Sequence, residues 1–167
     1  PIIFAGIVLN NNSMKNVASM SGLKPFSDQG HFFVVQETSP GVYNYGSGTP
    51  GKGTGVAYTS AMVGLPEWGT GHSRELDAYG YPKNDDSSWF GDPYRLCCTS
   101  NAMWGMLLSA YIMNAKPLWN SDAAFDYQDR FEMENAPLLQ SGQIVQWQNN
   151  WTSFPYAMWN AYRQNYP

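Results

Sequence analysis

The feature that most constrains this chain is a nearly continuous apolar stretch at residues 102–113, AMWGMLLSAYIM. Its apolar side chains surround the whole circumference of a helix rather than one stripe, and a helix of that kind is buried on every side. Such burial requires other helices around it, as in the inner layer of a two-layer helical assembly. We expect Asn114 and Pro117 to end this helix.

A second long helix is predicted to begin at residues 119–122 and to stop at Pro137. Asn120 or Ser121 is expected to cap its first turn. Its apolar positions 123, 124, 127 and 131 share one face, while three aspartates share another: Asp122, Asp126 and Asp129. We expect this acidic face to be solvated, with Asp126 paired to Arg130 four residues later.

Shorter helices are predicted near both ends of the chain. Residues 154–166 carry apolar side chains at helical spacing: Phe154, Ala157, Met158, Ala161 and Tyr162. Residues 13–20 suit a short helix capped by Asn12 or Ser13. Helix–turn–helix pairs therefore dominate the predicted structure.

The rest of the N-terminal half is predicted to consist of strand and loop. Residues 31–36, HFFVVQ, are β-branched and aromatic and are the best strand candidate. The region 39–96 is a long loop region that holds most of the polar residues of interest, and its part 64–96 is long enough that we expect turns or a short strand within it. The predicted fold class is mainly α, with antiparallel helix pairs, long loops and a minor β element.

The composition excludes several classes of function. The chain has 167 residues, enough for one compact domain, and only 13% of them are charged. Nine Lys and Arg residues are scattered along a chain of net charge −4, so no basic patch for nucleic acid is expected. No apolar run approaches the roughly 18 residues that a membrane span requires.

The start of the chain is unusual for a mature protein. It opens with PIIFAGIVL, without an initiator Met or a signal-like leader. We therefore expect 1–167 to be either a single domain or the C-terminal portion of a larger protein. The glycosylation sequons NNS at 11–13 and NWT at 150–152, together with few Lys and Glu residues, favour an extracellular or periplasmic location.

The richest polar stretch is residues 66–75, PEWGTGHSRE. It combines Glu67, Trp68, His72 and Arg74 with two glycines, and such a loop could supply a proton shuttle and an anion clamp. The alternative is structural: Glu67 and Arg74 would form a solvated ion pair, and His72 would bond to backbone.

A second polar group surrounds the start of the apolar helix. Tyr94 and Arg95 lie just before it and Asn101 lies in its first turn, where the helix dipole favours anions. A Tyr beside an Arg could hold and protonate a sugar oxygen. The alternative is that these residues only cap and pack the helix. Trp89 is a further candidate, because seven tryptophans are too many for one core of this size and we expect some to line a groove and stack on sugar rings.

No metal site is predicted. Cys97 and Cys98 are adjacent, so they cannot link distant segments and they lack the spacing of metal ligands. Residues 84–86, NDD, with Asp92 are the one candidate for a structural calcium ion, but they lack the EF-hand order. We therefore expect no cofactor.

The order of short motifs along the chain resembles a known class. These motifs are PIIFAG at residue 1, PEWG at 66, YRLCCTSNAMW at 94 and LWNSDAAFDYQDR at 118. Together they resemble the C-terminal part of large secreted bacterial proteins, similar to the (α/α)-toroid polysaccharide lyases of the alginate lyase and heparinase II-like kind. The resemblance implies an incomplete toroid that an N-terminal fragment or partner chain completes.

The resemblance also implies a reaction, β-elimination on a uronate-containing polysaccharide. Arg95 or Asn101 would neutralise the sugar carboxylate, His72 would remove the C5 proton, and Tyr94 would protonate the leaving oxygen. Two alternatives remain open. One is a glycoside hydrolase on the same toroid, with Glu67 and an aspartate of residues 122–129 as its carboxylate pair. The other is a non-catalytic carbohydrate-binding or structural subunit of an extracellular assembly.

Overall fold

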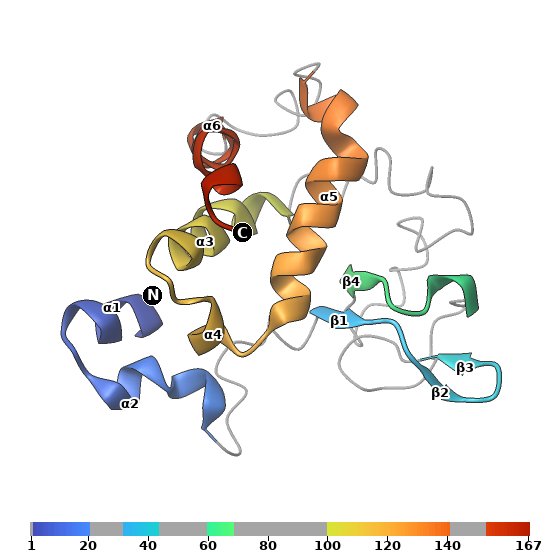
Figure 1. Cartoon of the computed structure of the whole chain (residues 1–167), viewed down its shortest axis with the longest axis horizontal. Coiled ribbons are helices and arrows are strands. Elements are labelled where there is room, and N and C mark those ends of the chain that lie inside the picture. The colour runs from blue at the N-terminus through green and yellow to red at the C-terminus, as the bar shows by residue number, and fades with distance from the viewer. Residues whose placement is uncertain (1, 21–31, 44–59, 69–99, 141–152) are drawn as a thin grey trace.

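The computed structural model describes residues 2–20, 32–43, 60–68, 100–140 and 153–167. They form a mainly helical structure with two small antiparallel sheets (Figure 1). The helices are α1 (Ile2–Val8), α2 (Asn12–Lys15), α3 (Ser100–Ile112), α4 (Lys116–Trp119), α5 (Asp122–Gln140) and α6 (Ser153–Tyr162), with 3₁₀ turns η1 (Val17–Ser19), η3 (Ser60–Met62) and η8 (Arg163–Asn165). The strands are β1 (Phe32–Val34), β2 (Glu37–Ser39), β3 (Val42–Tyr43) and β4 (Pro66–Trp68). The predicted mainly α class with a minor β element is confirmed.

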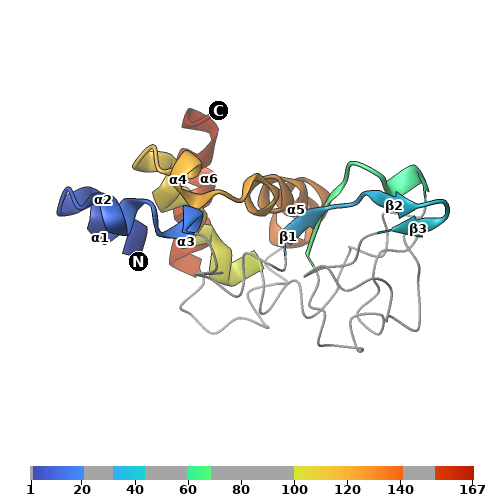
Figure 2. The ribbon, with the colours of Figure 1, turned by 90° about the horizontal axis from the view of Figure 1, so that it is seen from below.

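The longest helix, α5, lies between the helical part and the sheets (Figures 1 and 2). It contacts α3 on one side and both β1 and β4 on the other, while α6 packs on α3. Strands β1 and β4 pair antiparallel with Phe33 opposite Glu67, and β2 and β3 form a separate hairpin. The predicted strand at 31–36 is therefore confirmed at its centre, and the expected short strand within 64–96 is β4.

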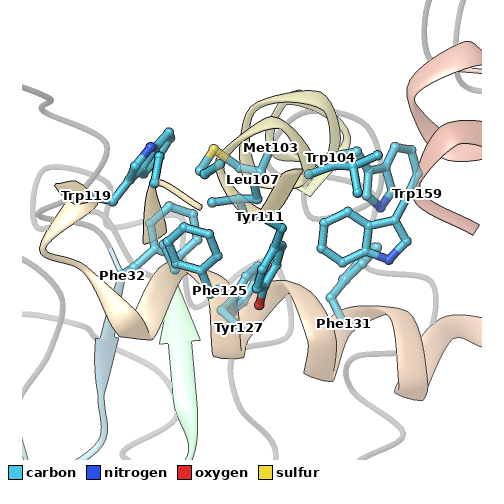
Figure 3. Close-up of a cluster of buried hydrophobic side chains, with 14 of the residues drawn as sticks. Phe32, Met103, Trp104, Leu107, Tyr111, Trp119, Phe125, Tyr127, Phe131 and Trp159 are labelled. Carbon is cyan, nitrogen blue, oxygen red and sulfur yellow. The ribbon is translucent and has the colours of Figure 1, made fainter. Parts of the chain in front are cut away.

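The core is a cluster of aromatic side chains from α3, α5 and α6 (Figure 3). Trp104, Phe125, Tyr127 and Phe131 are fully buried. Phe125 meets Tyr111 edge-on at 5.1 Å between ring centroids, and Phe32 of β1 meets Tyr127 at 5.3 Å. Edge-to-face pairs of this kind add to the energy of burial, so one aromatic cluster joins the helices to the sheet.

The apolar helix lies almost where the sequence predicts it, as α3. Its side chains at 103, 104, 107, 108, 110 and 111 are buried, but Ile112 is 46% exposed and Gly105 also lies at the surface. The prediction of burial on every side is therefore wrong for one face. That face lies opposite the contacts with α5, so the described helices cover α3 only in part.

Asparagines in the left-handed conformation end three of the described helices, namely α1, α3 and α4. Asn114, with φ of 51°, follows α3, where its N–H bonds to the carbonyl of Tyr111 and the N–H of Ala115 bonds to that of Ala110. This pair of bonds is the Schellman arrangement, and Asn10 ends α1 in the same way. The prediction that Asn114 ends the helix is confirmed. Pro117 lies instead in the first turn of α4, where its missing N–H costs nothing.

Several predicted helix boundaries are wrong. The cap of α2 is Asn11, whose side chain accepts from the N–H of Met14 at 3.1 Å, and the helix becomes a 3₁₀ turn after Lys15. Of the two predicted caps of α5, Asn120 ends α4 instead, whereas Ser121 directly precedes Asp122 and its carbonyl accepts from the N–H of Ala124, as the alternative predicts. The predicted stop at Pro137 is wrong, because α5 continues to Gln140. Proline at this position removes the bond that an N–H would donate to the carbonyl of residue 133, but only three further residues of helix follow it.

The predicted face of the C-terminal helix is also wrong. In α6 Phe154 is 70% and Tyr162 43% exposed, whereas Trp159 is buried against the core. One large indole that packs on α3 decides the orientation, because its burial outweighs that of the smaller apolar positions. In α5 the predicted apolar face is confirmed, with residues 124, 127 and 131 buried.

Candidate functional site

The candidate site is a pocket where α3 ends, which we call the α3–α4 pocket. Its volume is about 610 Å³, within the usual range for small-molecule sites. It is lined by Ala110, Tyr111, Asn114, Lys116, Pro117, Asn120, Asp122, Tyr166 and Pro167. Two tyrosines and two prolines thus face the same space as two amides, an ammonium and a carboxylate.

Turn geometry brings the polar groups of the pocket together. Asn114 and Asn120 both adopt left-handed backbone conformations, with φ of 51° and 52°. The chain therefore turns sharply after α3 and again after α4, within seven residues. Asp122 then begins α5, where the helix dipole favours a carboxylate. The result is a set of hydrogen-bond donors and acceptors on one rim of the pocket.

Lys116 is the cation of this rim. Its ammonium lies 5.6 Å from the ring centre of Tyr111 and 5.3 Å from that of Phe125, a cation–π arrangement. Within the described residues it forms no ion pair. Burial raises the pKa of Asp126 even though the charge of Lys116 opposes this shift. Lys116 is therefore held in place and retains its hydrogen-bonding capacity for a ligand.

A polar network behind the pocket fixes its two tyrosines. Arg163 donates through Nε and Nη2 to the two carboxylate oxygens of Asp129, at 2.9 and 2.5 Å, and through Nη2 to the hydroxyl of Tyr111 at 2.9 Å. It also donates through Nη1 to the carbonyl of Tyr166. Burial, with a further contribution from Asp129, raises the pKa of Tyr111 well above its ordinary value, so this tyrosine stays protonated at neutral pH.

A second buried polar group lies between α3, α5 and α6. Glu132 Oε1 accepts from the indole N–H of Trp104 and from Gln128 Nε2, the latter at 3.1 Å. Burial raises the pKa of Glu132 to about 7. The other amide atom of Gln128, Oε1, is buried and has no hydrogen-bond partner among the described residues. The ring of Tyr156 packs 4.9 Å from that of Trp104, and burial and the charge of Glu132 both raise its pKa.

Glu67, a predicted site residue, lies in a buried ion pair. Its carboxylate is 2.7 Å from Arg130 Nη1, and the two side chains are 1% and 7% exposed. The same nitrogen donates to the carbonyl of Pro66 at 3.1 Å, which ties β4 to α5. The structural alternative is therefore wrong in expecting Glu67 to be solvated, whereas its pairing with Arg74, which lies outside the described residues, stays a prediction. The predicted pair of Arg130 with Asp126 is wrong, because Arg130 pairs with Glu67.

Most other predicted site residues lie outside the described residues. Trp68 and Asn101 are placed by their backbones, in β4 and α3, but their side chains are not described. The segment 69–99 is not described, and it contains His72, Arg74, Trp89, Tyr94, Arg95, both cysteines and the calcium candidate. Whether these residues converge on one site stays a prediction.

The three tryptophans whose side chains are described, Trp104, Trp119 and Trp159, are all core residues. The α3–α4 pocket uses tyrosines instead. Sequence reasoning considered Asp122 only as part of a solvated acidic face or as one of the aspartates open to the hydrolase alternative, and it missed the other polar and aromatic lining residues: Tyr111, Asn114, Lys116, Asn120 and Tyr166. A signal for three of them exists in the stretch NAKPLWN at 114–120, where asparagines flank a proline-containing turn of helix.

The described residues contain no group of three or more His, Cys, Asp or Glu side chains that could hold a metal ion. None of their helices is long and apolar enough to span a membrane.

Comparison with known proteins gives no relatives: no family model, no curated protein and no solved structure matches this chain.

Proposed function

We propose that this protein binds carbohydrate in the α3–α4 pocket. The observation that carries the proposal is the composition of the pocket, in which Tyr111 and Tyr166 line the same space as Asn114, Asn120 and Asp122. Sugars present apolar ring faces and many hydroxyls, which such a mixture of aromatic, amide and carboxylate groups can contact together.

The proposed ligand is a uronate-containing polysaccharide or oligosaccharide. Support comes from Lys116, whose ammonium lines the pocket without an ion pair among the described residues. A sugar carboxylate there would gain a charge-assisted hydrogen bond. Asp122 and the amides would remain available for the hydroxyls.

We further propose that the chain takes part in degradation of this glycan by β-elimination, as part of an (α/α) toroid that another chain or segment completes, in an extracellular or periplasmic setting. The proposal rests on the resemblance described above and on the helical character of the fold. The hydrolase alternative has less support, because the carboxylate of Glu67 is buried and bound to Arg130, which leaves it poorly suited to exchange protons with a substrate.

Binding is tested with a panel of neutral trisaccharides and the uronic acid trisaccharides that match them in linkage, based on glucose, galactose and mannose. Calorimetric titration of the wild type should give saturable binding of at least one uronate member. Replacing Lys116 by Met should weaken that binding about tenfold or more and leave the matching neutral sugar unaffected.

The amides are tested by a substitution that respects the backbone. Asn120→Gly removes the side chain, and glycine tolerates the left-handed conformation. The substitution should therefore weaken the binding of both the uronate sugar and its neutral match without disturbing the turn. Asn10→Gly is the matched control, since Asn10 has the same conformation but does not line the pocket. If no member of the panel binds the wild type, or if Asn120→Gly and Asn10→Gly behave alike, the proposed site is wrong.

A further inference from the structure

Arg163 stands out because one side chain contacts both tyrosines of the α3–α4 pocket without lining the pocket itself. Its guanidinium carbon lies 3.9 Å from the ring centre of Tyr111 and 5.8 Å from that of Trp159. The stacking contact covers one face of Tyr111, and the hydrogen bond fixes the hydroxyl. Tyr111 therefore has little freedom to rotate.

The same guanidinium also anchors the C-terminal turn. It bonds to the carbonyl of Tyr166, three residues along in the chain, and to both oxygens of Asp129 on α5. Tyr166 directly follows the 3₁₀ turn η8 and is partly buried against the core. Terminal residues of this kind are poorly ordered unless contacts tie them in place. Asp129 supplies this tie, because its two oxygens hold the guanidinium in a fixed plane.

We propose that Arg163 is a positioning residue for the α3–α4 pocket, which it preorganises for a ligand by fixing Tyr111 and Tyr166 relative to α5. This inference rests on the proposed sugar binding. Its physical basis is that side chains already ordered in the free protein lose little entropy when a ligand binds.

The geometry distinguishes positioning from charge alone. Arginine presents a planar fork of five N–H donors, and here the fork reaches Asp129, Tyr111 and Tyr166 at once. A lysine at this position keeps the charge, but its compact ammonium cannot reproduce three directed contacts. Arg163→Lys should therefore weaken binding while it retains most of the electrostatic attraction to Asp129.

The test uses Arg163→Lys and the control Gln164→Ala, an exposed neighbour on the same turn. The probe is the trisaccharide of the panel that binds the wild type best. We expect Arg163→Lys to weaken the affinity about tenfold, and to shift the ring signals of two isotope-labelled tyrosines in the sugar-free protein. Its melting temperature should stay within about 2 °C of the wild type, and Gln164→Ala should change none of these quantities.

Each other outcome overturns the inference. Equal affinity in Arg163→Lys would show that charge suffices, and loss of affinity only in step with loss of thermal stability would show a purely structural role. If Arg163→Lys folds poorly, Asp129→Asn replaces it: this variant keeps the acceptor oxygen, and unchanged affinity and tyrosine signals there would also refute positioning. If the wild-type protein binds no sugar, the proposed function itself is contradicted. If the wild-type protein binds sugar and Arg163→Lys binds it equally well, only this inference is contradicted.

Discussion

Glu132 allows the sharpest prediction about this molecule, because its carboxyl group is buried where ionisation is unfavourable. The pKa of Glu132 is about 7 in the folded protein, compared with 4.5 for an ordinary glutamate, and burial is the largest cause. The hydrogen bonds from Trp104 and Gln128 favour the charged form but do not compensate for the lost hydration, and the charge of Asp129 adds to the rise.

The sign of the effect follows from proton linkage. Between pH 4.5 and about 7 the folded protein keeps the proton on Glu132 while the unfolded chain has released it. Stability from this group is therefore fully present below the unfolded pKa and is lost as the pH rises to the folded pKa, at about 1.4 kcal/mol per pH unit. Over the whole window the loss is about 3 kcal/mol.

The test compares the wild type with Glu132→Gln by urea denaturation. Glutamine keeps an oxygen that can accept from the Trp104 indole, and its new amide can donate to the buried Gln128 Oε1. Because the pI is about 4.9, the series is best run from about pH 5.5 to about pH 8, where the protein carries net charge. Across that range the variant should gain about 2 kcal/mol of stability relative to the wild type.

Comparison with the variant removes the contribution of other groups, including Asp126, whose pKa is also raised. A stability difference that stays constant from the acidic to the alkaline end would refute the reasoning, since it would mean that Glu132 titrates alike in the folded and unfolded chains. If Glu132→Gln is less stable than the wild type at every pH, the decisive quantity is how the difference between their free energies of unfolding changes with pH.

Two further predictions concern packing. Replacing either Glu67 or Arg130 alone, as Glu67→Gln or Arg130→Met, should lower the free energy of unfolding by about 3–5 kcal/mol, because the buried charge that remains loses the partner 2.7 Å away. The double variant Glu67→Leu with Arg130→Met should recover much of this loss in the same urea titration. In the hairpin of α1 and α2, Gly6→Ala should cost about 1–3 kcal/mol, since its Cβ would lie 2.7 Å from the backbone N of Lys15, whereas Ala5→Gly in the same helix tests the loss of helix propensity alone.

The helical core could be predicted because its signals are local. The stretch 102–113 is apolar enough to require burial, and the spacing of residues 124, 127 and 131 matches the observed buried face of α5. The exposed face of α3 could not be foreseen, because it depends on which elements pack around the helix. In α6, likewise, the contacts that Trp159 and Tyr156 make with α3 determine the buried face.

The polar pairs were mispredicted for a related reason. Spacing along a helix favours Asp126 with Arg130, but the observed partner of Arg130 is Glu67, 63 residues away in the sequence. A surface pair of that local kind contributes only tenths of a kcal/mol, so it offers little resistance when tertiary packing brings a buried carboxylate close. The pairing of Asp129 with Arg163 is also long-range, across 34 residues.

These long-range pairs share one helix, and this has a consequence for the pocket. Within about one turn near the middle of α5, Asp129 binds the C-terminal turn, Arg130 binds β4, and Glu132 binds the indole of α3. Aromatic packing alone is tolerant of small rotations, whereas directed polar contacts to three different elements fix the rotation of a helix about its axis. Asp122 and Asp129, which anchors Arg163, both lie on α5, so the polar contacts near the middle of this helix help to determine the geometry of the α3–α4 pocket at its first turn. Glu132→Gln keeps these contacts and should leave sugar affinity unchanged, whereas loss of the contact made by Asp129 should not.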